Sequence, residues 1–145
     1  MKDLLYLKDD QIKEFIEHIF YAYRETYSDP KKILKKHSFG TAHHRAIHLI
    51  ERNNGITISG LLKKLKITKQ SLNRVIRDLV KNKTIYIKKG DIDSRQRQVF
   101  LNEKGKKLFD EIFNVQKKRI YNALKNSDSD SVIKFKNVLH KIINE

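Results

Sequence analysis

The stretch Ile67–Leu79 limits the possible folds of this chain more than any other segment. Its apolar side chains recur at steps of three and four residues, which places them on one face of a helix: Leu72, Val75, Ile76 and Leu79. Thr68 stands just before this pattern, where a hydroxyl can cap the first turn. The opposite face carries short polar and long basic side chains, namely Lys69, Gln70, Ser71, Asn73, Arg74 and Arg77. We therefore expect a short helix whose back joins a core and whose polar front faces outward.

Positive charge is concentrated in the part of the chain that contains this helix. The formal net charge is +15, and residues 39–102 contribute +10 of it, with fourteen Lys and Arg against four Asp and Glu. Residues 1–38 contribute +1 and residues 103–145 contribute +4. Such an excess favours a polyanionic partner, either nucleic acid or an anionic membrane surface, although a basic surface without a partner would have the same composition. Arg and Lys can bind guanine, and Asn and Gln can bind adenine, in the major groove, so we expect double-stranded DNA as the partner.

The composition also excludes several classes of protein. No run of eighteen apolar residues is present, so we expect no membrane span. Acidic residues begin at Asp3, too early for a signal peptide, and there is no cysteine for a disulfide, a thiol switch or a Cys-ligated zinc. The motifs of hydrolases, nucleotide-binding loops and zinc proteases are missing, so we expect neither an enzyme nor a cofactor. The simplest location is the cytoplasm.

Three short helices with a tight turn before the last describe a helix-turn-helix. The first begins at Gly40-Thr41 and ends at Asn53-Asn54-Gly55, because Asn and Gly are common at helix C-termini. Thr57 can cap the second helix. Ile67-Thr68 then connects it to the helix described above, which should end near Asn82.

Two strands are expected next. Ile85 and Ile87 alternate with outward-facing residues, and so do Val99 and Leu101. The segment between them, Lys89–Arg97, is polar and basic with a glycine near its start. A helix-turn-helix followed by such a hairpin is a winged helix, whose wing tip can place an arginine in the minor groove.

The terminal segments carry wide apolar stripes that a small winged helix cannot cover. In the N-terminal helix, which ends at Asp29-Pro30, the stripe is Ile12, Phe15, Ile16, Ile19, Phe20, Tyr23 and Tyr27. Asn102 can cap a long helix, and a break at Asn126-Ser127-Asp128 precedes a last one. These stripes could be buried by pairing with a second chain or by packing within one chain. We expect a mixture of the two.

The predicted fold class is mainly α with a small β-hairpin wing. It consists of a winged helix-turn-helix DNA-binding domain over residues 39–102, flanked by dimerisation helices. Residues 1–38 would form the N-terminal dimerisation helix and a connector, and residues 103–145 the C-terminal dimerisation helices.

From Gly40 to Gly105 the order of elements and residues resembles the MarR family of bacterial winged-helix regulators. The match rests on Thr41–Ile50, on Gly55–Leu62 with Ile67–Leu72, and above all on the wing segment. That segment, Asp91–Gly105, is similar to the family's aspartate and arginines followed by Val-x-Leu-Thr-x-x-Gly. The strings Ala-His-His-Arg and Ile-Thr-Lys-Gln-Ser-Leu look like a narrower subgroup, the PetP-like proteins.

Two positions depart from the family pattern. Ser94 stands where arginine is common, which removes one possible phosphate contact. Asn102 stands where threonine is common and keeps the capping role.

The resemblance implies a homodimer with interlocking terminal helices, two winged helices on a pseudo-palindromic DNA site, and transcriptional repression. It implies contacts to base edges and nearby phosphates in the major groove for Lys69, Gln70, Ser71, Asn73 and Arg74, with Arg77 nearer the backbone. Arg95 would enter the minor groove, oriented by Asp93 through a charge-assisted pair. Phosphate contacts would come from Lys88, Lys89 and Arg97, and from Thr57 and Ser59 through backbone N–H groups at a helix start. An architectural nucleic-acid-binding protein, or a winged helix that contacts another protein, are the alternative functions.

Two sets of residues raise the question of small ligands. Family members often bind aromatic or anionic effectors beside the dimer helices. The residues that could line such a site here also fit core packing: Phe20, Tyr23, Tyr27, His44 and Phe113. His44 and His48 lie one helical turn apart with Glu51 on the same stripe, a spacing that can hold a metal or make binding pH-dependent. Histidines on such a helix more often pack or form hydrogen bonds, so we expect no metal.

Overall fold

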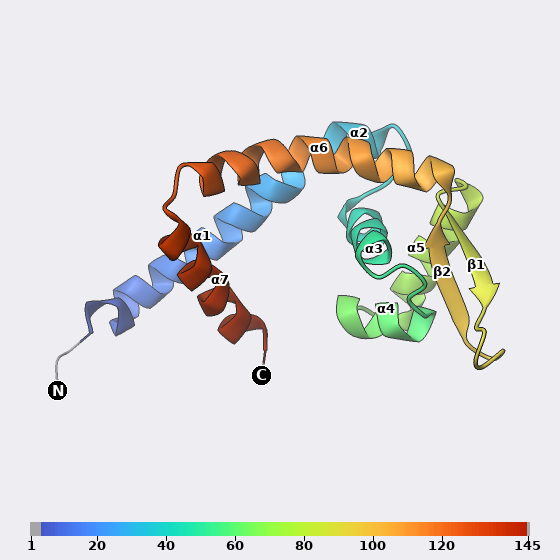
Figure 1. The fold of residues 1–145 in the computed structure, drawn as a ribbon, viewed down its shortest axis with the longest axis horizontal. Coiled ribbons are helices and arrows are strands. Elements are labelled where there is room, and N and C mark those ends of the chain that lie inside the picture. Colours follow the sequence, from blue (N-terminus) through green and yellow to red (C-terminus); the bar gives the residue numbers. More distant parts are fainter. Residues whose placement is uncertain (1–3, 145) are drawn as a thin grey trace. The chain divides into compact units, whose positions relative to one another are not determined.

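The chain is mainly helical with one small β-hairpin, as the sequence predicts (Figure 1). The structure is a computed structural model, and it describes residues 4–144. After a short 3₁₀ turn at Leu5–Leu7, the elements are α1 (Asp9–Ser28), α2 (Lys31–Lys35), α3 (Thr41–Arg52), α4 (Ile58–Leu65), α5 (Lys69–Lys81), β1 (Ile85–Lys89), β2 (Arg97–Leu101), α6 (Glu103–Lys125) and α7 (Ser129–Ile143). Within residues 4–144, no helix is long and apolar enough to cross a membrane.

The chain forms two compact units. One is Tyr27–Phe113, which we call the winged-helix unit. The other, the terminal unit, joins the described residues up to Thr26 with those from Asn114 onward. The boundaries between the two units fall inside helices α1 and α6, so each of these helices contributes residues to both units. The expected division at residues 38 and 102 remains a prediction about functional parts.

The winged-helix unit has a continuous apolar core built from every one of its helices and both strands. The core residues are Leu34, Phe39, Ala46, Ile47, Ile50, Leu61, Leu72, Val75, Ile76, Leu79, Ile85, Val99, Leu101, Leu108, Phe109 and Ile112. The four apolar positions that define the Ile67–Leu79 pattern are all among them. Burial of this face therefore holds α5 with its polar face toward solvent.

The hairpin is antiparallel, with Ile85 opposite Leu101 and Ile87 opposite Val99, so the predicted inward residues share one face. Lys89 pairs with Arg97, which the sequence placed in the loop. The loop is shorter than expected, residues 90–96, because backbone pairing continues through polar residues. Figure 1 shows this loop at the end of the hairpin remote from α6.

Caps fix where the functional helices begin. The Thr57 and Thr68 hydroxyls accept the backbone N–H groups of Gly60 and Ser71. The Asn102 side chain accepts the Gly105 N–H at 3.0 Å and starts α6. All three predicted caps are thereby confirmed.

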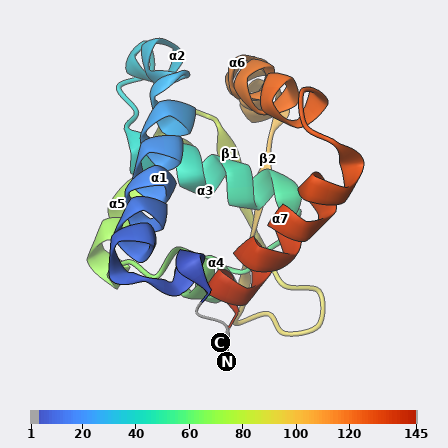
Figure 2. The ribbon, with the colours of Figure 1, turned by 90° about the vertical axis from the view of Figure 1, so that its left-hand side faces the viewer.

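The terminal unit has no buried residue on α1 or α7. Figure 2 shows the ribbons of helices α1 and α7 lying apart from each other. The large hydrophobic side chains that these helices leave exposed are Ile12, Phe15, Ile16, Ile19, Phe20, Tyr21, Tyr23, Ile133, Phe135, Val138, Ile142 and Ile143. A single chain therefore covers little of the terminal stripes.

Candidate nucleic-acid interface

The polar front of α5 is fully available to a partner. Every residue that the sequence assigned to this face is exposed: Lys69, Gln70, Ser71, Asn73, Arg74 and Arg77. Thr68 also donates its hydroxyl hydrogen to Ser71 Oγ at 2.9 Å, which fixes the side chain at the start of the face. The amides and cations beyond it point outward from a helix held by its buried face.

The start of α4 lies between α5 and the hairpin. A hollow of about 270 Å³ is lined by Ser59 of α4 and by Lys69 and Asn73 of α5, among others. A second hollow of about 520 Å³ is lined by Ser59 again, with Arg95 and Arg97 of the wing side. Because both hollows share Ser59, they join six of the predicted residues in one surface: Thr57, Ser59, Lys69, Asn73, Arg95 and Arg97. We call it the basic surface. The other predicted residues line neither hollow: Gln70, Ser71, Arg74, Arg77, Lys88, Lys89 and Asp93.

The charged side chains that line the two hollows of the basic surface are all cationic: Lys63, Arg95 and Arg97 in the larger hollow, and Lys69 in the smaller one. The residues that line them include no Asp or Glu: Thr57, Ile58, Ser59, Gly60, Leu62, Lys63, Lys69, Leu72, Asn73, Arg95, Gln96 and Arg97. A concave surface of one charge sign attracts an extended partner of the opposite sign. The two hollows therefore suit the phosphate backbone of a nucleic acid.

In the wing, Asp93 holds Arg95. The Asp93 carboxylate accepts hydrogen bonds from Arg95 Nε at 3.1 Å, from its Nη2 at 3.2 Å and from its backbone N–H at 3.0 Å. These bonds, led by the side-chain one, lower the pKa of Asp93 below its ordinary value. The Arg95 side chain nevertheless remains 90% exposed, so it is oriented without being buried. The charge-assisted pair predicted from the sequence is present.

The other cations of the wing lie along the hairpin. Lys88 Nζ is 3.5 Å from the Asp91 carboxylate and 6.0 Å from the centre of the Phe100 ring. Lys89 and Arg97 stand opposite each other at the end of the strands, and both are exposed.

Two polar side chains of the basic surface were missed by sequence reasoning. Lys63 and Gln96 line the hollow between α4 and the wing. Lys63 follows Ser59 by one helical turn, a spacing that could have indicated it. Gln96 comes into position through the backbone turn in which its N–H donates to Asp93 O at 3.0 Å, a contact without a sequence signal.

A histidine joins α5 to α3. His43 Nδ1 accepts the Gly40 N–H at 3.0 Å, so the proton is on Nε2, which donates to Asp78 of α5 at 2.9 Å. The His43 ring also stacks on Phe39 with ring centres 4.7 Å apart. Sequence reasoning considered other histidines as metal ligands and gave His43 no role, yet His43 anchors the C-terminal half of α5.

The other histidines of α3 face aromatic rings. The ring centre of His44 is 5.1 Å from that of Tyr27, and the ring centre of His48 is 5.8 Å from that of Phe109. Burial lowers the pKa of His48, and Glu51 opposes that shift only in part. No three His, Cys, Asp or Glu side chains among residues 4–144 are grouped to hold a metal ion.

The five candidate effector residues belong to different units. Tyr27 and His44 contact each other in the winged-helix unit, where Phe113 stacks on Phe109 at 5.9 Å. Phe20 and Tyr23 belong to the terminal unit and are exposed. The effector site stays a prediction.

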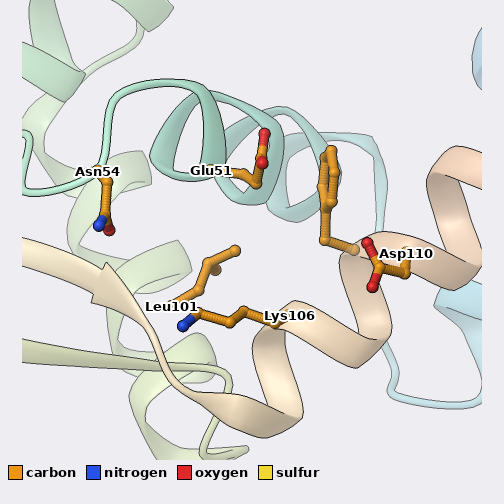
Figure 3. A pocket seen from close by; sticks show the side chains of 6 residues that line it. Glu51, Asn54, Leu101, Lys106 and Asp110 are labelled. Atoms are coloured by element: carbon orange, nitrogen blue, oxygen red, sulfur yellow. The ribbon is translucent and has the colours of Figure 1, made fainter.

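A further hollow of about 280 Å³ lies at the C-terminal end of α3 (Figure 3). It is lined by Glu51, Asn54, Leu101, Lys106, Phe109 and Asp110, and Figure 3 shows Lys106 lying along Leu101. Two carboxylates stand beside one lysine here. This mixed charge does not favour a polyanion, in contrast to the basic surface.

Comparison with known proteins agrees with this geometry. A family model described as MarR family matches residues 37–96. The HTH-type transcriptional regulator PetP of Rhodobacter capsulatus is 41% identical over 140 residues, which cover 97% of this chain and 84% of that protein. The chain belongs to the MarR family. Its likeness to PetP agrees with the subgroup that the sequence strings indicated.

Solved MarR structures share the fold. A mutant MarR from E. coli in complex with operator DNA has a TM-score of 0.68 and 19% identity, over 97% of this chain and 99% of that one. Staphylococcus aureus MarR in complex with salicylate and kanamycin has a TM-score of 0.73 and 23% identity, over 92% of this chain and 91% of that one. At these low sequence identities, the similarity to both structures shows the shared fold and nothing further.

Proposed function

We propose that this MarR family protein is a homodimeric transcriptional repressor that binds a pseudo-palindromic DNA site. One observation carries the proposal: two adjoining hollows without Asp or Glu connect the start of α4 with Lys69 and Asn73 of α5 on one side and with Arg95 and Arg97 on the other. The rest of the polar face of α5 is exposed beside them. A helix with an exposed front of this kind fits the major groove, and a wing fits the adjacent minor groove. A DNA partner also implies a cytoplasmic location.

In this proposal the residues have distinct roles. Lys69, Gln70, Ser71, Asn73 and Arg74 meet base edges and nearby phosphates, and Arg77 contacts the backbone. Arg95, oriented by Asp93, enters the minor groove. Phosphates are bound by Lys88, Lys89 and Arg97, by the start of α4 at Thr57 and Ser59, and by Lys63, which the structure adds.

The exposed apolar stripes support the homodimer. Phe15, Ile16 and Ile19 of α1 are 47–63% exposed, and Phe135 and Ile142 of α7 are 55% and 61% exposed. Large contiguous apolar surfaces are rare on monomers. Two copies of the terminal unit would cover each other, and they would present two basic surfaces to two half-sites.

Repression is what the family resemblance of the sequence implies, and effector control is proposed by analogy with a solved relative. PetP is named a transcriptional regulator, and S. aureus MarR is solved with salicylate. We propose an aromatic or anionic effector for this chain too, and the residues proposed to contact it remain those that the sequence suggested: Phe20, Tyr23, Tyr27, His44 and Phe113.

Selection from random duplex DNA at physiological salt, followed by a salt titration of the recovered sites, tests the DNA-binding proposal. A pseudo-palindromic consensus with two half-sites is the expected result. Binding without any enriched sequence and with a steep salt slope would instead indicate an architectural protein. Absence of binding would leave a winged helix that contacts protein, and either outcome would contradict sequence-specific regulation.

A further inference from the structure

Ile92 is the most exposed large hydrophobic side chain among the described residues. Its relative exposure is 102%, whereas the other exposed large hydrophobic side chains of residues 4–144 range from 39% to 72%. Single exposed aliphatic residues are common on proteins and by themselves indicate nothing. Ile92 differs from such residues in its position, because it lies at the tip of the wing and three residues from Arg95.

The turn that carries Ile92 is held by its own hydrogen bonds. Gly90 N–H donates to Gln96 O at 2.9 Å, and Gln96 N–H donates to Asp93 O at 3.0 Å. A Cβ at Gly90 would lie 2.6 Å from Asp93 O, so the turn requires glycine there. Because Asp93 also binds Arg95 through three hydrogen bonds, Ile92 and the guanidinium are presented by one closed turn.

The acids beside Ile92 do not oppose an anionic partner. Asp93 is paired with Arg95, and Asp91 lies 3.5 Å from Lys88 Nζ. The tip therefore offers an aliphatic side chain between two ion pairs. The minor groove of DNA offers the complementary surface, because its walls are the weakly polar deoxyribose rings and it accepts apolar side chains beside cations.

We propose that Ile92 packs against the sugars of the minor groove that receives Arg95 and thereby contributes apolar contact to the affinity of the wing. The inference rests on the proposed DNA-binding function. Burial of an aliphatic side chain is favourable, so losing part of that contact should weaken binding by about tenfold. The contact involves no charge, so it should leave the salt dependence of binding unchanged.

The test uses the full-length protein and a duplex recovered by selection from random DNA. Dissociation constants are measured over a range of salt for the wild-type protein and for Ile92→Ser, Ile92→Leu and Arg95→Ala. We expect Ile92→Ser to bind about tenfold more weakly at every salt concentration and Ile92→Leu to bind like the wild type. Arg95→Ala should instead reduce the salt slope by about one. Hydroxyl-radical footprinting should show that Ile92→Ser loses protection of sugars at the wing sites only.

Equal affinity of Ile92→Ser and the wild type, or sugar protection that persists in Ile92→Ser, would overturn the inference while leaving DNA binding intact. A wild-type protein that binds no duplex would overturn the proposed function and this inference together. Since the Ile92 side chain is fully exposed, urea denaturation of its variants should match that of the wild type, which separates a lost DNA contact from a lost fold.

Discussion

The carboxylate of Asp93 is paired with Arg95 inside the wing. Three hydrogen bonds from Arg95 lower its pKa below the ordinary value, so the carboxylate remains ionised at any pH near neutrality. The interaction would be lost only as the pH falls through that lowered pKa. An acid close to DNA would ordinarily repel it, but here the acid fixes the direction of the arginine that we propose to enter the minor groove.

Replacing Asp93 with alanine should therefore weaken DNA binding although it removes a negative charge. Arg95 would have to be ordered at the moment of binding, which should reduce affinity about three- to tenfold. Fluorescence anisotropy with a selected duplex measures the effect. Asp91→Asn is the matched control, since it removes a charge from the same loop without touching Arg95, and its affinity should be unchanged or higher. Tighter binding by Asp93→Ala would contradict the orienting role.

His48 should make folding stability depend on pH. Its folded pKa is lowered from the ordinary 6.5, mainly by burial, so the unfolded chain takes up the proton more readily. Stability is then fully present above about pH 6.5 and declines as the pH falls through that value toward the lowered folded pKa. Urea midpoints at pH 7.5 and 5.5 should differ less for His48→Gln than for the wild type. The same difference in both proteins would show that His48 is not responsible.

At the scale of elements, the join between the hairpin and α6 keeps the wing in register with the core. Asn102 N–H donates to Thr84 O at 3.2 Å, while the Asn102 side chain caps α6. Gly105 lies directly against Thr84 O, where a Cβ would collide with backbone. This close contact explains why the family's wing pattern has a glycine at the position of Gly105.

Gly105→Ala should destabilise the fold by about 3 kcal/mol, because the backbone of two elements must separate to admit the methyl group. Gly40→Ala is the control, since nothing lies within 4 Å of a Cβ there. Its free energy of unfolding should change by less than about 0.5 kcal/mol. Chemical denaturation of the two variants measures both values, and similar stabilities would contradict this account of the join.

The elements that the sequence predicted are those with a local signal. The spacing of Leu72, Val75, Ile76 and Leu79 and the caps Thr57 and Thr68 depend on neighbours along the chain, and all are present as expected. The bond between His43 and Asp78 joins residues 35 positions apart, so no local pattern announces it. The position of Gln96 likewise depends on a turn that forms only in the folded hairpin.

At the scale of the whole molecule, the two units differ in how much of their apolar surface a single chain buries. The winged-helix unit encloses a core of its own, whereas α1 and α7 bury no residue. A stable monomer would leave these aromatic and aliphatic stripes in water. The proposed second copy accounts for them without any further partner.

Charge placed on the stripe should dissociate the dimer. Phe15→Glu would put a carboxylate into an apolar interface, whereas His18→Glu adds a carboxylate to the same helix away from the stripe. Sedimentation velocity should give a monomer for Phe15→Glu and a dimer for His18→Glu and the wild type. A wild-type protein that sediments as a monomer at micromolar concentration would contradict the dimer.

In the proposed complex, α5 reads bases while the wing and α4 hold the DNA backbone. The most direct measurement compares the sites that the wild-type protein and Asn73→Ala select from random duplex DNA. We predict the same pseudo-palindrome with preference relaxed at one or two base pairs in each half-site, a loss of about 1–3 kcal/mol of discrimination there. Identical selection profiles for the two proteins would contradict base reading by α5.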